Sequence, residues 1–233
     1  MRLTYRIVRW LVLVVFRVLW RPRVTGLEHI PPHGAIIVAS NHLSFIDSVV
    51  IPLAVPRRVR FLAKAEYFEG RSLTGRVIAM FFRAVDAVPV RRDSRRDSMA
   101  SLETALDVLR DGHAFGIYPE GTRSRDGRLY RGKTGVGWLA LASGAPIVPV
   151  CVVGTDAVQP VGARLPRIRP VRIQFGPVVD PAPWVEQVRS SGGAGRARRE
   201  ITDLVMESIA AMSPQEPADT YNERPPDDDD PAA

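Results

Sequence analysis

The chain has 233 residues, of which 45% are hydrophobic and 24% are charged, and this balance is typical of a globular protein with a substantial core. The single cysteine, Cys151, excludes an internal disulfide and fits a reducing compartment. The net charge of +7 is uneven, because the segment from Ser213 onward carries −6 and leaves +13 for the body. The arginine-rich body suits a nucleic acid, an anionic membrane or a phosphorylated substrate, unless it only reflects codon usage in a GC-rich genome.

Residues 1–23 predict an amphipathic helix that associates with a membrane. Their longest uninterrupted apolar run, 10–16, is far shorter than the ~20 residues that span a bilayer. On a helical wheel the arginines gather on one face and the other faces are apolar, with tryptophans near the boundary (Arg2, Arg6, Arg9 and Arg17; Trp10 and Trp20). Such a helix lies in the membrane interface with its arginines at anionic headgroups. The alternative is a first helix that packs on the domain's own core.

Residues 24–180 predict an α/β domain, with a mostly parallel or mixed sheet flanked by helices, because short apolar runs alternate with helical patterns. Strands are expected at 35–39, 59–63, 84–88, 114–118, 147–153 and 171–175, and helices at 47–54, 72–82, 98–110 and 134–142. A linker and a last helix at 198–212 make up residues 181–212. The acidic, proline-rich tail 213–233 is expected to be disordered and dispensable for turnover.

His42 and Asp47 follow the first of these apolar runs, in the stretch "NHLSFID". Ligands of α/β sheets gather at the ends of such strands. If a helix begins near Asp47, the turn before it can fold the carboxylate back onto the imidazole, and Nε2 is then left to take a proton. The alternative is that Asp47 is an ordinary acidic residue in the first turn of a helix.

Two further stretches, "YPEGTRS" and "VPVRRD", also follow strand patterns. In the first, Gly121 lets backbone amides approach an anion, and Arg123 with Lys133 behind it can place positive charge on a phosphate. Glu120 can accept a hydrogen bond from a substrate hydroxyl or from an arginine, and so fix the loop. In the second, Arg92 is either a phosphate ligand or a solvated charge.

These stretches, together with "VPV" at 148–150, resemble the motifs of the glycerophospholipid acyltransferase family, and especially those of bacterial 1-acyl-sn-glycerol-3-phosphate (lysophosphatidic acid) acyltransferases. The resemblance covers residues 26–176. It implies that His42 is the catalytic base and Asp47 its partner. It also implies a group of residues around the glycerol phosphate: Arg92, Glu120, Gly121, Thr122, Arg123 and Lys133. Two positions depart from the family pattern, since Arg91 stands where an aspartate is usual and Tyr118 where a phenylalanine is.

The reaction implied by the resemblance moves a fatty acyl group from acyl-CoA or acyl-carrier protein to the free hydroxyl of lysophosphatidic acid, giving phosphatidic acid. A thioester is already activated and the chain has no Gly-x-Ser-x-Gly elbow, so we expect no covalent acyl-enzyme. No cofactor and no metal site are expected, and Ser44 and Ser48 are interpreted as structural. The acceptor is alternatively glycerol 3-phosphate or another lysophospholipid.

Two other classes of function remain open at this stage. A non-catalytic membrane scaffold would explain the first helix, but it would not need the His-Asp pair. A nucleic-acid-binding module would interleave its arginines with stacking aromatics, which make up only 7% of the chain. We therefore expect a peripheral or monotopic enzyme on the cytoplasmic face of the cell membrane. Its expected partners are a lysophospholipid, an acyl donor and anionic lipids, with no nucleic acid.

Overall fold

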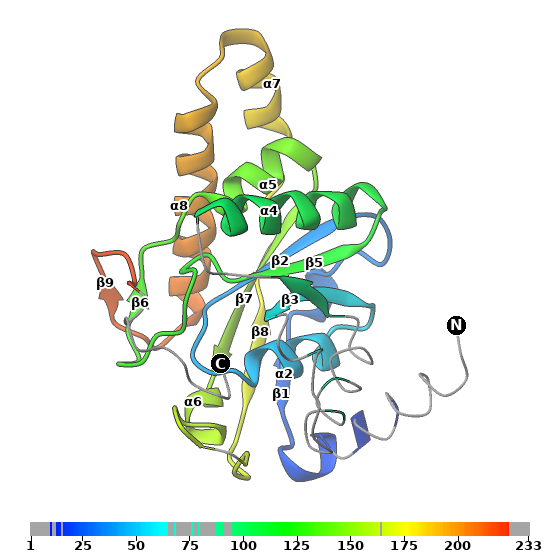
Figure 1. Ribbon diagram of the computed structural model, residues 1–233, viewed down its shortest axis with the longest axis vertical. Helices are drawn as coiled ribbons and strands as arrows, with labels where there is room; N and C mark the ends of the chain where they lie inside the picture. Colours follow the sequence, from blue (N-terminus) through cyan, green and yellow to red (C-terminus); the bar gives the residue numbers. More distant parts are fainter. Residues whose placement is uncertain are drawn as a thin grey trace.

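The computed structural model describes residues 10, 13, 14, 16–64, 68, 76, 79, 87–90, 95–163 and 165–223 (Figure 1). Its strands are β1 (Arg23–Thr25), β2 (Ile36–Ser40), β3 (Val59–Lys64), β4 (Val88–Val90), β5 (Ala114–Ile117), β6 (Leu129–Tyr130), β7 (Ile147–Val153), β8 (Arg172–Phe175) and β9 (Pro217–Ala218). Its helices are η1 (Leu27–His29), α2 (Asp47–Ala54), α4 (Arg95–Arg110), α5 (Gly135–Ser143), α6 (Thr155–Val158), α7 (Ala182–Ser191) and α8 (Ala194–Met212).

A mixed sheet forms the centre of the described part of the chain. It has seven strands in the order β1-β8-β7-β2-β5-β3-β4. The run from β7 to β4 is parallel throughout, whereas β8 pairs antiparallel with β7 and carries β1 beside it. β2 and β5 are neighbours in register, Ala39 opposite Ile117, so the turns that follow them leave the sheet side by side at the same edge. This pairing brings the two predicted motifs together.

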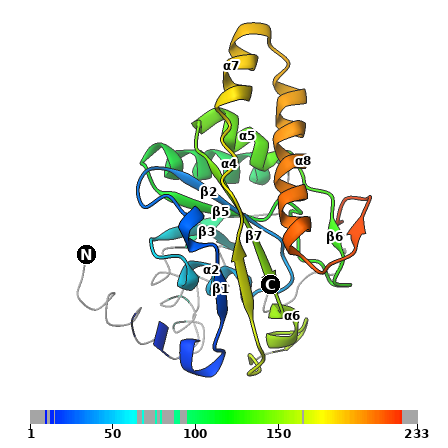
Figure 2. The same ribbon diagram turned by 180° about the vertical axis from the view of Figure 1, so that it is seen from behind.

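The sheet is buried on both faces, which explains why its central strands read as unbroken apolar runs. Side chains of β2 alternate between the two cores: Ile36 and Val38 join the core under α2, while Ile37 joins the core under α4, α5 and α8. The view from behind shows the long α8 standing beside β7, with which it is in contact (Figure 2). Ile201 of α8 is fully buried, so the C-terminal helix belongs to the same packed unit as the predicted catalytic domain.

The sequence predictions hold best for the central elements. β7 and α2 have the predicted bounds, and β2, β3, β5, β8 and α5 differ by one residue at one or both ends. α4 begins three residues early. Of the predicted helix 72–82 only residues 76 and 79 are described, and both are helical. Most of the predicted strand 84–88 lies outside the described residues, and β4 begins only at Val88.

The C-terminal region departs from the prediction in two ways. α7 was not predicted, because it has no buried residue and so leaves no apolar periodicity. The predicted glycine-rich linker is a tight turn at Gly192 and Gly193, both with positive φ, from which α8 begins four residues before the predicted start. The predicted start of tail disorder at residue 213 also needs correction: residues 213–223 lie against the domain and include β9. Residues 224–233 lie outside the described part.

The described part of the N-terminal segment packs on the domain's core, as the alternative interpretation expected, and it also leaves apolar side chains exposed. Residues 10, 13, 14 and 16–19 are helical, and Phe16 packs into the core with Leu13 and Trp20 beside it. Other apolar side chains of the same segment are exposed, among them Trp10 and Val18. Most of its predicted arginine face, at positions 2, 6 and 9, lies outside the described residues. Among the helices that are described, none has the length and apolarity needed to cross a bilayer.

Candidate active site

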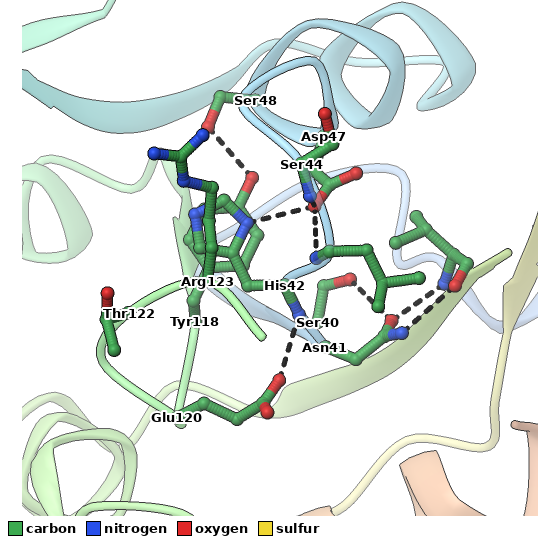
Figure 3. A network of polar contacts seen from close by, with 12 residues as sticks. Ser40, Asn41, His42, Ser44, Asp47, Ser48, Tyr118, Glu120, Thr122 and Arg123 are labelled. Carbon is green, nitrogen blue, oxygen red and sulfur yellow. Dashed lines mark hydrogen bonds and ion pairs between the residues drawn. The ribbon is translucent and has the colours of Figure 1, made fainter. Parts of the chain in front are cut away.

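His42 and Asp47 form the predicted pair in the turn between β2 and α2 (Figure 3). His42 Nδ1 and Asp47 Oδ2 are 2.9 Å apart, and the same oxygen accepts the backbone N–H groups of Leu43 and Ser44, each at 2.8 Å. The Asp47 side chain is fully buried, while that of His42 is 13% exposed. A carboxylate held by these donors makes Nδ1 the protonated ring nitrogen, so the basic lone pair of the imidazole is on Nε2.

Tyr118 fixes the plane of the His42 ring. The two rings stack with centroids 3.8 Å apart and planes 7° from parallel. The Tyr118 hydroxyl lies 2.9 Å from Ser48 Oγ, which belongs to α2. A phenylalanine at this position could stack in the same way but could not make the hydroxyl contact. Sequence reasoning missed this role of Tyr118 and Ser48, although the departure from the family pattern at position 118 was a visible signal.

Glu120 is turned inward and joins the two motif loops. Its carboxylate oxygens accept the backbone N–H of His42 at 2.9 Å and that of Tyr130 at 3.0 Å, and the residue is fully buried. Burial raises the pKa of Glu120 to about 7. The two amide hydrogen bonds lower the pKa, but their effect is smaller than that of burial. Of the roles that the sequence suggested, this geometry favours fixing of the loop, achieved through backbone amides rather than through an arginine.

Gly121 and Lys133, two members of the predicted group, lie close together. Gly121 has a φ of +81°, and a Cβ added there would come within 3.0 Å of the Lys133 side chain. The backbone N–H of Lys133 donates to the carbonyl of Pro119 at 2.7 Å, which ties the lysine to the start of the loop. The Lys133 residue is exposed, so its ammonium is available at the surface beside the glycine.

Thr122 and Arg123 follow Gly121 on the same loop and are both half-buried. Arg123 extends past the stacked rings of His42 and Tyr118 in Figure 3. Immediately after it, the backbone N–H of Ser124 donates to the carbonyl of His42 at 2.8 Å. The loop that carries the positive charge is therefore bonded to the backbone of His42 itself. Arg92, the remaining predicted member of the group, lies outside the described residues, just past the end of β4.

Asn41, another residue that sequence reasoning did not single out, anchors the turn to the sheet. Its amide pairs with both backbone groups of Val152: Nδ2 donates to the carbonyl at 2.9 Å and Oδ1 accepts from the N–H at 2.8 Å. These two hydrogen bonds extend the pairing of β2 with β7 by one residue beyond Ser40, through a side chain instead of the backbone. The residue next to it, His42, is thus held at a fixed distance from the sheet.

Comparison with known proteins identifies the family of this chain. A family model described as Acyltransferase matches residues 21–153, more than half of the chain. The chain belongs to the acyltransferase family. The matched region contains His42, Asp47, Glu120, Arg123 and Lys133.

Individual relatives carry a more specific name. A chloroplastic 1-acyl-sn-glycerol-3-phosphate acyltransferase of Brassica napus is 30% identical over 62% of this chain and 41% of its own length. Bacterial proteins named 1-acyl-sn-glycerol-3-phosphate acyltransferase are 29% identical in Bacillus subtilis, over 58% of this chain and 64% of that protein, and 32% identical in Borreliella burgdorferi, over 57% and 51%. The chain thus spans less than two thirds of the length of each of these relatives.

A solved structure shares the fold. The crystal structure of the 1-acyl-sn-glycerophosphate acyltransferase PlsC from Thermotoga maritima matches 92% of this chain and 85% of its own, with a TM-score of 0.62 and 24% sequence identity. The mixed α/β architecture predicted from the sequence is therefore confirmed both by the strand pairing and by a solved structure of the same fold.

Proposed function

We propose that this protein transfers a fatty acyl group from a thioester donor to the free hydroxyl of lysophosphatidic acid, giving phosphatidic acid for phospholipid synthesis. The observation that carries the proposal is the buried Asp47 carboxylate on His42 Nδ1, in a turn bonded to a loop with Arg123 and Lys133. Family membership supports acyl transfer, and the names of the relatives support this acceptor. The donor is acyl-CoA or acyl-carrier protein, since both present the same thioester.

In the proposed mechanism His42 acts as general base and then as general acid. Nε2 takes the proton of the acceptor hydroxyl as its oxygen attacks the thioester carbonyl, which forms a tetrahedral intermediate. The C–S bond then breaks, the ester remains on the acceptor, and the imidazolium returns the proton to the thiolate to give the free thiol. Asp47 stabilises the imidazolium between these steps. The thioester is activated already, so the proposed transfer needs no cofactor and no covalent acyl-enzyme.

The acceptor phosphate is assigned to the second loop. Arg123 and Lys133 supply charge-assisted hydrogen bonds, and the backbone at Gly121 and Thr122 gives an anion close access. Arg92, which follows β4 by two residues in the sequence, is a further proposed ligand on the ground of the family resemblance. With the phosphate held there and His42 bonded to the same loop, the acceptor hydroxyl is brought to a fixed distance from Nε2.

The assay that tests the proposal measures thiol release from acyl-CoA or acyl-carrier protein in the presence of lysophosphatidic acid, glycerol 3-phosphate or lysophosphatidylcholine. We expect the highest kcat/KM with lysophosphatidic acid, and a loss of turnover in His42→Ala. A preference for glycerol 3-phosphate would replace the proposed acceptor but keep the chemistry. Absence of thiol release with every acceptor and both donors would refute acyl transfer and favour a scaffold.

We also propose that the enzyme works peripherally at the cytoplasmic face of an anionic membrane, attached through the N-terminal segment. The exposed apolar side chains Trp10, Val14 and Val18 recur at helical spacing on one side of that segment. Deletion of the segment would also remove Phe16 from the core, so substitution is the cleaner test. Serine at these three positions should release the protein from anionic vesicles without lowering its melting temperature, and unchanged binding would refute the attachment.

A further inference from the structure

The loop that follows α6, residues 160–163 and 165–170, has a defined backbone and an apolar exterior. The N–H of Arg167 donates to the carbonyl of Val158 at 2.7 Å, and that of Ala163 donates to the carbonyl of Pro160 at 3.0 Å. The indole N–H of Trp20 donates to the carbonyl of Arg167 at 2.9 Å, which joins the loop to the N-terminal segment. Both ribbon views show α6 and the N-terminal segment at the same end of the molecule (Figures 1 and 2).

This end of the molecule carries the most exposed large apolar side chains of the described residues. Leu165 is 79% exposed and Ile168 64% in the loop, and Trp10 is 63% and Val18 61% exposed in the N-terminal segment. Large apolar side chains that gather in one region, rather than singly, mark a surface that binds a partner. Leu165 and Ile168 flank or adjoin residues whose backbone is hydrogen-bonded to the loop base, since Arg167 is bonded to Val158 and Ala163 to Pro160.

The charges of the loop identify the partner. Arg167 and Arg169 are both exposed and flank Ile168, and the sequence has no acidic residue between Asp156 and Asp180. Apolar side chains interleaved with arginine fit a surface whose interior is hydrocarbon and whose outer layer is anionic. An apolar protein surface would bury Leu165 and Ile168, but it would offer no negative charge to the neighbouring arginines.

We propose that this loop, residues 160–163 and 165–170, is a second membrane contact, which inserts Leu165 and Ile168 among anionic lipids beside the N-terminal segment. The loop base also contacts the active-site turn, because Ser44 Oγ donates to the carbonyl of Gln159 at 2.7 Å. Attachment at this point turns the His42 edge of the sheet toward the bilayer, where a lysophospholipid acceptor resides. The identity of the acceptor in this inference rests on the proposed function, whereas the membrane docking does not.

The docking is tested by sedimentation of the full chain with phosphatidylcholine vesicles, with and without phosphatidylglycerol. Leu165→Ser with Ile168→Ser should weaken vesicle partitioning by about tenfold or more, since each side chain loses its burial in hydrocarbon. Arg167→Gln with Arg169→Gln should weaken it only where phosphatidylglycerol is present. The matched control is Leu204→Ser on α8, which is also exposed but lies on another element.

Turnover separates this inference from the proposed function. The Leu165/Ile168 variant should acylate detergent-dispersed lysophosphatidic acid at the wild-type rate and vesicle-embedded acceptor several-fold more slowly. Wild-type vesicle binding by this variant would overturn the docking inference, whatever its activity. If the wild-type chain shows no acyl transfer, the sedimentation result still decides the docking.

A second inference comes from residues 213–223, which we call the C-terminal strap. The strap runs from the end of α8 along the loop after β5. β9 pairs in parallel with β6, the N–H of Leu129 donates to the carbonyl of Glu216 at 2.9 Å, and that of Arg131 donates to the carbonyl of Thr220 at 3.0 Å. The strap therefore covers the far end of the loop that begins at Glu120.

Two amide side chains of the strap hold the active-site loops. Asn222 is buried, and its Nδ2 donates to the carbonyls of Arg123 at 3.0 Å and Thr122 at 3.4 Å. Gln215 Oε1 accepts from Asn41 Nδ2 at 2.6 Å, next to His42, and its Nε2 donates to the carbonyls of Gly127 and Arg128 at 3.0 and 3.1 Å. Backbone carbonyls at the proposed phosphate-binding residues are thus tied to a segment about a hundred residues later.

We infer that Asn222 is a positioning residue for acceptor binding, acting through the backbone of Thr122 and Arg123. This inference rests on the proposed role of Arg123. Without the Asn222 bonds, the loop regains freedom that the acceptor must then remove on binding, and this raises the acceptor KM. The chemical step at His42 is unaffected, because the His42–Asp47 pair is formed entirely within its own turn. The expectation that the whole tail from residue 213 is dispensable is revised accordingly.

The test compares Asn222→Ala with Trp184→Phe, a control that removes the 3.0 Å indole hydrogen bond to Glu200 between α7 and α8. Asn222→Ala should raise the acceptor KM about 3- to 10-fold, the scale of one lost hydrogen bond, with kcat and donor KM near wild type. Trp184→Phe should leave all three unchanged. A chain truncated after Glu223 should behave as wild type.

Amide hydrogen exchange keeps the inference testable if no acyl transfer is found. Asn222→Ala should speed exchange in residues 121–131 while exchange in α4 stays unchanged. If residues 121–131 exchange at the same rate in the variant and in the wild type, the positioning role is overturned. Faster exchange with an unchanged acceptor KM would also overturn it, because the strap would then be structural only. Absence of acyl transfer in the wild-type chain would instead refute the proposed function.

Discussion

The two turns that build the candidate site are held in different ways. The catalytic pair in the turn between β2 and α2 is assembled locally: Asp47 accepts from His42, Leu43 and Ser44, all within five residues. The loop after β5 depends on remote partners. Glu120 reaches back to His42, 78 residues earlier, and Asn222 reaches Thr122 from 100 residues later.

This difference separates the two proposed tasks of the site. A base and its carboxylate must keep one geometry through the proton transfer, and a short turn with a buried acceptor provides that. A loop that binds the acceptor phosphate must be accessible to the substrate, so it is exposed at Gly121 and Lys133. Its position is held by hydrogen bonds from residues outside the loop. Changes in the first turn should therefore lower kcat, and changes in the second loop should raise the acceptor KM.

The largest effect is expected from His42→Ala. Loss of the base should lower kcat by at least ~10²–10⁴, the range for a positioned proton transfer. The fold should persist, because the contacts of His42 with Glu120 and Ser124 use its backbone. Steady-state kinetics and a thermal melt check both expectations. A variant that keeps most of its turnover while folded would show that another group takes the proton.

Asp47→Asn should also lose most of its kcat, and it should be less stable than His42→Ala. The amide oxygen can still accept from Leu43 and Ser44, but the charge that stabilises the imidazolium is gone. The double variant should be barely slower than His42→Ala, because the two side chains act as one unit. Multiplicative losses in kcat would show that Asp47 acts separately from His42.

Arg123→Ala is the corresponding change in the second loop. It should weaken acceptor binding by roughly 1.5–3 kcal/mol, the scale of a hydrogen bond to a charged group, with little change in the donor KM. Lys133→Ala should act in the same direction but less strongly, because this exposed side chain is better solvated. A change confined to the donor KM would assign the loop to the donor's phosphates instead.

Glu120→Gln tests the contact between the two loops through its pH dependence. The pKa of Glu120 is about 7 in the folded protein, above the ordinary 4.5, so its contribution to the unfolding free energy is present below about pH 4.5 and is lost as the pH rises through 7. The loss is up to roughly 3 kcal/mol over this window. Glutamine does not titrate, so the variant should melt near wild type at pH 5 and gain on it toward pH 8. The opposite trend would mean that the two amides stabilise the ionised carboxylate more than burial disfavours it.

The smallest effect is expected from Tyr118→Phe, which keeps the stacked ring but removes the hydroxyl contact with Ser48. The kcat should fall by less than about tenfold, on the scale of one hydrogen bond, and Ser48→Ala should reproduce the change. Kinetics of the two single variants and the double variant decide the matter. If the fall in kcat of the double variant equals the product of the two single falls, the two hydroxyls act on His42 independently and not through their mutual contact.

The sequence by itself determined the central strands of the sheet, the helices that pack closest to it and the His42–Asp47 pair (β2, β3, β5, β7 and β8; α2, α4 and α5). The edge strand β1 and the helix α7 were not predicted. A strand buried on both faces must be apolar along its whole length, so β2 and β7 are visible as unbroken runs. The pair is five residues apart, and a turn followed by a helix start is enough to bring its side chains together. Signals of this kind depend only on neighbours within a turn or a strand.

Only the tertiary structure decided how the second loop is held. The inward direction of Glu120 follows from the pairing of β2 with β5, which sets the amide of His42 beside the carboxylate. The contacts of Gln215 and Asn222 lie in a segment whose polar, proline-rich composition indicates disorder, because single hydrogen bonds between distant segments leave no periodic pattern in a sequence. Their strength depends on the burial and alignment that the folded sheet provides.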